Sequence, residues 1–150
     1  MVTEIEIEEA AKLRPQKRKA SEFSHITTLE GLTLQEKVNF SFNNVHHFFR
    51  VYLYDRSHIC AKCGREIETL KRATLDHVVP KSMGGRTRLS NLQLMHPSCN
   101  SRKGNEMPGE IDPRAFIPIH QNRESFEKHH LRRYWVFEEL HYTNRMKDAV

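Results

Sequence analysis

The sequence predicts an α+β protein, in which two short strands and a helix form a core between N- and C-terminal helices. Three observations favour this class. Apolar residues recur at steps of three and four over residues 33–56 and again over 123–146, which is typical of amphipathic helices. Two short apolar runs, 73–79 and 92–95, have the length of strands. Pairs of cysteine and histidine residues lie outside these two runs, at the spacing of metal ligands.

The N-terminal part, residues 1–30, is predicted to be a flexible tail. Of the 150 residues, 37% are hydrophobic and 29% are charged, so the chain can bury one modest core and is expected to carry loose ends. The tail shows no clear period, and an acidic run over residues 4–9 precedes the basic run "KLRPQKRK". We interpret the basic run as a solvated segment; the alternative is an arm that contacts phosphates.

Residues 31–56 are predicted to form a helix that flanks the core. Thr33 and Glu36 have the spacing of a capping box, in which two side chains satisfy backbone N–H groups at the start of a helix. We interpret His46 and His47 as residues of the helix surface and core edge. One face of the helix is apolar and is expected to be buried; its residues are Leu34, Val38, Phe42, Val45, Phe49 and Tyr52.

The rest of the chain divides into a central domain, residues 57–105, and a C-terminal part, residues 106–150. The central domain is expected to contain, in order, a tight turn (the knuckle, at Cys60–Cys63), a strand, a loop, a second strand and a helix. Prolines and a glycine between residues 104 and 120 predict an extended connection to the C-terminal helix.

Two pairs of residues predict a structural zinc ion. Cys60 and Cys63 have the spacing C-x-x-C, and His96 and Cys99 have the spacing H-x-x-C after an interval of 32 residues. Thiolates and imidazoles are the ligands that tetrahedral structural zinc prefers. A zinc ion bound here would staple the intervening segment into a loop and would supply much of its local folding free energy.

Other interpretations of the cysteines fit the chain less well. Ordinary buried cysteines would not explain the matching second pair, and a thioredoxin-like redox motif requires a βαβ setting that the pattern lacks. Three cysteines also argue against a disulfide framework, so we expect a reducing compartment, namely the cytoplasm, or the host cytoplasm for a phage-encoded protein. No run of 18 apolar residues is present, so no membrane span is expected.

A second group of residues, inside the stapled segment, suits phosphodiester hydrolysis. Asp76 and His77 are adjacent, and Asn100 follows the last zinc ligand. Carboxylate and amide oxygens hold hard divalent cations, and a neutral histidine can accept a proton from water. Residues 60–104 carry nine Lys and Arg against three Asp and Glu, in a chain whose net charge is +5. This distribution favours an anionic partner, first of all nucleic acid.

The stretches "CAKC", "LDHVVPKSMGG" and "NLQLMHPSCNSRKG" occur in the order and approximate spacing of the zinc-containing HNH endonuclease motif, so residues 60–104 resemble that family. The resemblance implies a ββα-metal (His-Me finger) fold, with a two-stranded hairpin and a helix around one divalent ion. It implies a metal-dependent endonuclease that nicks DNA or cleaves both strands, with structural Zn²⁺ and with Mg²⁺ or Mn²⁺ as the catalytic cation.

The resemblance also implies roles for individual residues. His77 is expected to be the general base, and Asp76 and Asn100 are expected to bind the divalent cation. Asn91 is expected to hold the catalytic loop and to orient the histidine. His96 stands where many zinc-containing members have a cysteine and could be mistaken for the last catalytic histidine, but its H-x-x-C spacing assigns it to zinc.

Two basic residues on the last helix of the motif are expected to hold phosphates. Lys103 lies three residues after Asn100, on the same side of the predicted helix, and Arg102 is beside it. For Arg102, a solvated helix surface is nearly as good an interpretation. Sequence specificity is expected to come from outside the motif, from the flanking helices, from a homodimer or from a protein partner.

Two functions from other classes compete with the nuclease. One is a zinc-stapled nucleic-acid-binding module that has lost activity, but such a module has no need for the intact set Asp76, His77 and Asn100. The other is a redox or regulatory protein that uses Cys60 and Cys63, which predicts a thiol-dependent activity without retained zinc.

Overall fold

A computed structural model of the chain describes residues 13–116. These residues form three α-helices, α2 (Leu34–Asn43), α3 (Val45–Arg56) and α4 (Pro97–Lys103), and two strands, β1 (Thr74–His77) and β2 (Leu92–Met95). The predicted α+β class is therefore confirmed, whereas the predicted C-terminal helix over 123–146 lies outside the described residues. No helix within residues 13–116 is long and apolar enough to cross a membrane.

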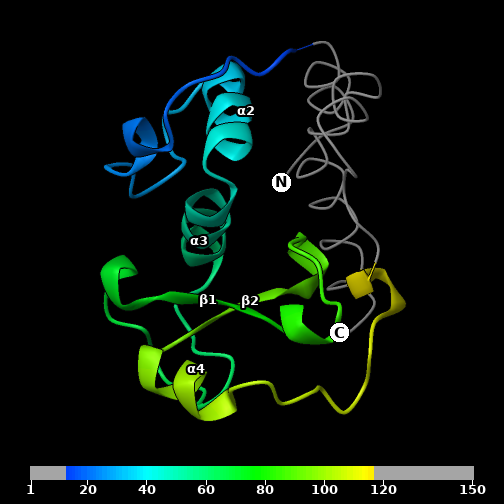
Figure 1. Cartoon of the computed structure of the whole chain (residues 1–150). Coiled ribbons are helices and arrows are strands. Elements are labelled where there is room, and N and C mark those ends of the chain that lie inside the picture. The colour runs from blue at the N-terminus through cyan, green and yellow to red at the C-terminus, as the bar shows by residue number, and fades with distance from the viewer. Residues whose placement is uncertain (1–12, 117–150) are drawn as a thin grey trace, which may run out of the picture.

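The two strands form an antiparallel hairpin that lies between α3 and α4 (Figure 1). The register pairs Thr74 with Met95 and His77 with Leu92, so the strands are aligned along their full length. Because side chains alternate along a strand, Thr74 and Asp76 leave one face of β1 while Leu75 and His77 leave the other. Hydrogen bonds from α4 reach Thr74 and Asp76, and buried Leu75 belongs to the hydrophobic core that includes α3.

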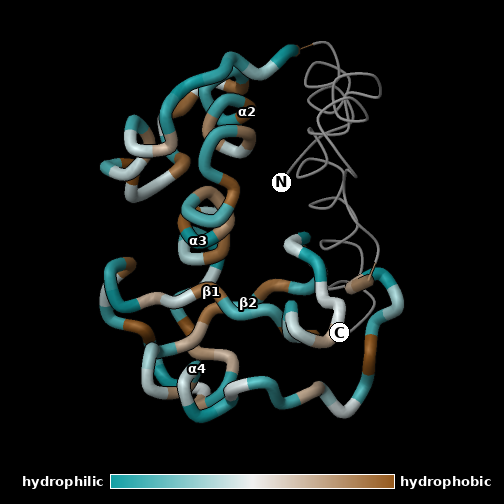
Figure 2. Tube along the Cα trace, in the orientation of Figure 1, coloured by the Kyte–Doolittle hydropathy of each residue, from teal (hydrophilic) through white to brown (hydrophobic). Residues whose placement is uncertain are grey.

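The core is built mainly from aromatic residues of α2 and α3 and from apolar residues of the hairpin. Phe40 and Phe48 are fully buried and meet edge to face with ring centroids 5.3 Å apart. Hydrophobic and hydrophilic residues are interleaved along both helices, as expected for helices with one buried face (Figure 2). The largest side chains with no more than 1% exposure are Phe40, Phe48, Phe49, Ile67, Leu89, Met95, Val38, Val51 and Val79.

The helix predicted over 31–56 is in fact two helices, which are separated by Asn44. The backbone of Asn44 has φ −148° and ψ 69°, which is not helical. Its N–H donates to Phe40 O and closes α2, and its side-chain oxygen accepts from His47 N and starts α3. Asparagine favours such breaks because its side chain competes for local backbone hydrogen bonds. The capping box at Thr33 is present as predicted.

The segment expected to be a flexible tail is packed against α2 from residue 13 onward. Phe23 is buried and stacks on Phe40, with ring centroids 5.3 Å apart. The backbone N–H of Gln16 donates to Asn39 Oδ1 at 2.8 Å, and that of Arg18 donates to Asn43 Oδ1 at the same distance. A segment without a period of its own is thus ordered by aromatic stacking and by amide side chains of α2. Residues 1–12 lie outside the described part.

Candidate metal centre and active site

The first half of the candidate metal centre is a tight turn between Cys60 and Gly64. The N–H of Gly64 donates to Cys60 O, and Gly64 adopts φ +73°, a left-handed conformation that favours glycine. The N–H of Cys60 donates to Arg65 O at 2.8 Å and closes the knuckle. The N–H of Ala61 donates to Leu94 O at 2.9 Å, which attaches the knuckle to β2.

The second half comes from the start of α4. His96 is the N-cap residue of this helix, Pro97 occupies its first turn, and Cys99 lies on its buried side. One ligand atom each from Cys60, Cys63, His96 and Cys99 lies within 4.8 Å of the other three. The four residues predicted as zinc ligands are therefore brought together.

Two separations between donor atoms are close to those of a tetrahedral zinc site. His96 Nδ1 lies 3.4 Å from Cys63 Sγ and 3.9 Å from Cys99 Sγ. Zinc bonds of ~2.3 Å to sulfur and ~2.0–2.1 Å to nitrogen place the two atoms about 3.5 Å apart in a tetrahedron. The cluster of three cysteines and one histidine thus suits structural zinc.

The surroundings of His96 and Cys60 favour the forms of these side chains that bind a metal. His96 Nε2 donates to Glu66 O at 3.0 Å, which leaves Nδ1 as the unprotonated nitrogen that faces the sulfur atoms. Burial raises the pKa of the Cys60 thiol, but the backbone N–H groups of Cys63, His96 and Lys62 outweigh it and lower that pKa to about 6. A thiolate, the form that binds metal, is therefore accessible at neutral pH.

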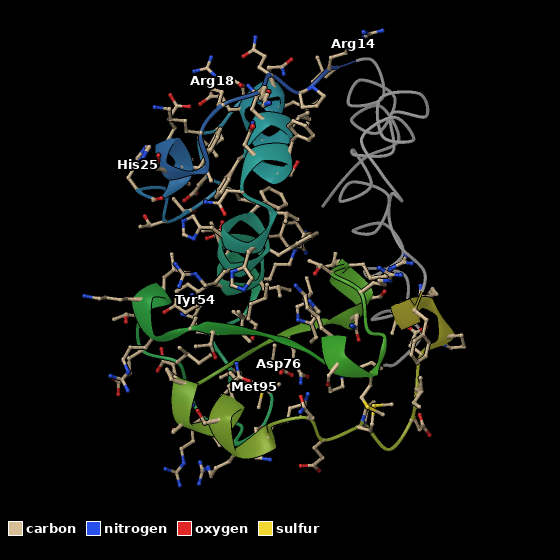
Figure 3. All side chains as sticks on the ribbon, in the orientation of Figure 1. Arg14, Arg18, His25, Tyr54, Asp76 and Met95 are labelled. Atoms are coloured by element: carbon tan, nitrogen blue, oxygen red, sulfur yellow. The ribbon has the colours of Figure 1, made fainter. Side chains whose placement is uncertain are left out.

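Asp76 lies on the side of the hairpin that faces α4 (Figure 3). Its carboxylate is buried, with only 8% of the side chain exposed. Oδ2 accepts a hydrogen bond from Gln93 Nε2 at 2.9 Å, and Gln93 is the residue directly opposite in the hairpin register. Lys103 Nζ lies 3.1 Å from the same oxygen, so this buried carboxylate already faces a positive charge.

His77 is the last residue of β1, and its side chain leaves the opposite face of the strand from Asp76. Its Nε2 lies 2.8 Å from Thr87 Oγ1, in the loop between the strands. Partial burial is the main cause that lowers the pKa of His77, and the charge of Lys81 lowers it further. The carboxylate of Asp76 acts in the opposite direction. The ring is therefore neutral at physiological pH.

Asn91 is completely buried and holds the loop that follows His77. Its Oδ1 accepts from Val79 N at 2.8 Å, and its Nδ2 donates to Val79 O at 3.1 Å and to Arg86 O at 2.9 Å. Its backbone oxygen accepts from Val78 N. One asparagine therefore closes the loop on both sides. Gly85 is required at this point, because a β-carbon there would overlap Val79 O.

Three polar residues of α4, Asn100, Arg102 and Lys103, have different surroundings. Asn100 Nδ2 donates to Thr74 Oγ1 at 3.1 Å, so the amide of Asn100 lies beside β1. Thr74 is two residues before Asp76, so the two side chains leave the same face of the strand. Lys103, one turn further along α4, contacts Asp76 and donates to His77 O at 2.9 Å. Arg102 Nη2 lies 3.5 Å from Cys99 Sγ, at the metal centre rather than beside Asp76.

Two residues of this site were not expected from the sequence, Gln93 and Thr87. Gln93 becomes visible only when the strand register is known, because it then lies opposite Asp76. Thr87 lies in the loop after the glycine pair, and no spacing rule connects it with His77.

The fold and the site together define an α+β domain with a cysteine–histidine cluster, a candidate metal centre, attached to a ββα unit. The model of the HNH endonuclease family matches residues 60–106, which are 47 of the 150 residues. The resemblance stated from the motif residues is thereby confirmed for this segment, and it implies a nuclease-type function with nucleic acid as the substrate. No curated protein and no solved structure matched the chain.

Proposed function

We propose that the protein is a metal-dependent endonuclease that hydrolyses phosphodiester bonds of DNA, with His77 as the general base. The observation that carries this proposal is the combination of a neutral, hydrogen-bonded histidine and a buried carboxylate on adjacent residues, at the edge of a family-matched ββα unit. The basic charge of residues 60–104 supports an anionic substrate.

His77 has the surroundings of a base. In the proposed tautomer Nε2–H donates to Thr87 Oγ1, and Nδ1 then carries the lone pair that accepts a proton from water. The lowered pKa keeps this lone pair available at neutral pH. Asn91 acts as a positioning residue, because it fixes the loop that begins directly after His77.

The donor set beside α4 fits a hard divalent cation such as Mg²⁺ or Mn²⁺. Asp76 would supply a carboxylate oxygen and Asn100 an amide oxygen, and neither is a soft ligand. The ammonium of Lys103 next to Asp76 indicates that this carboxylate accepts a cationic neighbour. When bound, such a cation would stabilise negative charge on the phosphate and the leaving oxygen. Lys103 would hold the phosphate once the cation is paired with Asp76.

The reaction uses these residues as follows. Water attacks the phosphorus while His77 removes one of its protons, so a new P–O bond forms. The bond from phosphorus to the 3′ oxygen breaks, and that oxygen takes a proton from solvent. The products are a 5′-phosphate and a 3′-hydroxyl. Each turnover cuts one strand, so double-strand cleavage requires a dimer or a second event.

The test is a nicking time course on supercoiled plasmid with Mg²⁺, for the wild-type protein and His77→Ala. Removal of a general base is expected to lower the rate by ~10²–10⁴. His77 lies outside the metal cluster, so zinc content and melting temperature are expected to stay at wild-type values.

Nicking at the wild-type rate by His77→Ala would place the base elsewhere. A wild-type protein that binds DNA but never nicks it would favour the inactive nucleic-acid-binding module. A thiol-dependent activity without retained zinc would favour the redox alternative.

A further inference from the structure

An open pocket with a volume of about 280 Å³ lies at the start of α3, outside the set of residues assigned to the metal centre and the active site. None of the residues that line it is acidic, and three of them carry an imidazole or a guanidinium group. The lining residues are Ser24, Asn44, His46, His47 and Arg50.

Arg50 is held in this pocket with unused hydrogen-bonding capacity. His47 Nε2 donates to Ile26 O at 2.9 Å, so Nδ1 of the same ring is an acceptor. This Nδ1 accepts a hydrogen bond from Arg50 Nη2 at 3.1 Å. Arg50 Nε is buried and has no hydrogen-bond partner among residues 13–116. Leaving a buried donor of a charged group unsatisfied is costly. Arg50 also lines the pocket, so its guanidinium group can offer N–H donors to an anionic ligand with several oxygens.

The pocket is adjacent to the face of the hairpin from which His77 emerges. α3 packs against both strands, and His77 leaves β1 on the face opposite Asp76. The pKa of His46 is lowered by desolvation and by the charges of Arg50 and Lys81. The charges of Lys81 and His46 in turn lower the pKa of His77. The pocket, Lys81 and the candidate base are therefore electrostatic neighbours.

We infer that this pocket binds a backbone phosphate of the nucleic acid, close to the phosphate that is cleaved. This inference rests on the proposed nuclease function, because it concerns the substrate of that site. Arg50 supplies charge-assisted hydrogen bonds to the phosphate oxygens, and exposed His46 supplies a further donor from the rim. His47 is a positioning residue, because its ring holds the guanidinium in place.

The experiment is a fluorescence-anisotropy titration of a labelled DNA duplex, in the His77→Ala background with Mg²⁺ and at several salt concentrations. Arg50→Gln is expected to weaken binding about tenfold, the scale of one charge-assisted hydrogen bond. It is also expected to reduce the slope of log Kobs against log salt by ~0.9, the value for one lost phosphate contact. His46→Glu, at an exposed position that does not threaten the fold, is expected to weaken binding as well.

Arg56→Gln is the matched control. It removes one positive charge from the same helix, six residues away, at an exposed side chain that stacks over Tyr52. The salt slope of this variant is expected to equal that of the unsubstituted background. Equal slopes and affinities for Arg50→Gln and Arg56→Gln, or undiminished binding by His46→Glu, would overturn the inference.

The same measurements separate this inference from the proposed function. If the protein with intact His77 never nicks plasmid but Arg50→Gln still lowers affinity and slope, the nuclease proposal fails and the phosphate pocket stands. If the protein nicks plasmid but Arg50→Gln behaves like Arg56→Gln, the pocket inference fails alone. If the duplex does not bind at any salt concentration, both fail.

Discussion

Gly85 offers a sharp test of the loop that follows His77. A β-carbon at this position would overlap Val79 O and would lie 3.0 Å from Asn91 Nδ2. Both groups belong to the buried hydrogen bonds between Asn91 and Val79. The neighbour that would have to move is backbone rather than the end of a flexible side chain. Gly85→Ala is therefore expected to break these hydrogen bonds, because no flexible side chain can move aside for the added methyl group.

The expected cost has two parts. Forcing an extra methyl group into a packed site typically costs ~1–3 kcal/mol. Separating the buried amide of Asn91 from its partners costs a further ~1–3 kcal/mol. A combined loss of about 2–6 kcal/mol in the free energy of unfolding, at ~2–4 °C per kcal/mol for a chain of this size, lowers the melting temperature by about 4–24 °C.

Thermal unfolding followed by circular dichroism is a suitable assay, with Gly109→Ala as the matched control. A β-carbon at Gly109 would meet no atom within 4 Å, so this variant is expected to melt at the wild-type temperature. Plasmid nicking by Gly85→Ala should also decline, because the displaced loop begins directly after His77. Equal melting temperatures for the two variants would refute the reasoning about close packing at Gly85.

Two further predictions concern the metal centre and the pH dependence. Cys63→Ser and Cys99→Ser are each expected to lose bound zinc and to lower the melting temperature, as checked by metal analysis and calorimetry on the same samples; a variant that keeps both would contradict the ligand assignment. The kcat/KM for cleavage is expected to rise with pH through a midpoint below 6.5, since burial and Lys81 lower the pKa of the proposed base and only its neutral form accepts a proton. Lys81→Gln is expected to move this midpoint upward, and a wild-type midpoint above 6.5 would exclude His77 in this role.

The zinc centre was predictable because its information is local. The two ligands of each pair are separated by two residues, which is enough to define a turn or the first turn of a helix. The chemistry of cysteine and histidine restricts the bound ion to a few metals. The hairpin was also predictable, because strand-length apolar runs lie between the pairs. The family match over residues 60–106 spans the segment that holds both features.

What the sequence did not reveal depends on contacts between distant residues. The break at Asn44 needs both helix ends to be known, since one side chain starts α3 while the backbone N–H closes α2. The packing of Phe23 on Phe40 has no periodic signal, because it comes from a single aromatic residue in a polar segment. Gln93 and Thr87 require the register of the hairpin and the path of its loop.

Helix α4 has only seven residues, which is well below the length at which a helix persists alone in water. Its orientation must therefore be imposed by contacts outside the helix, and a metal ion held by His96 and Cys99 at its N-terminal end would add a strong constraint. Lys103 and Asn100 are carried on the same rigid segment, at about 1.5 Å per residue from Cys99. Zinc binding at this cluster would therefore be thermodynamically linked to the alignment of these two side chains with β1. Chelation would disorder the α4 side of the site first, while α2 and α3, which are packed around their own aromatic residues, would retain their structure.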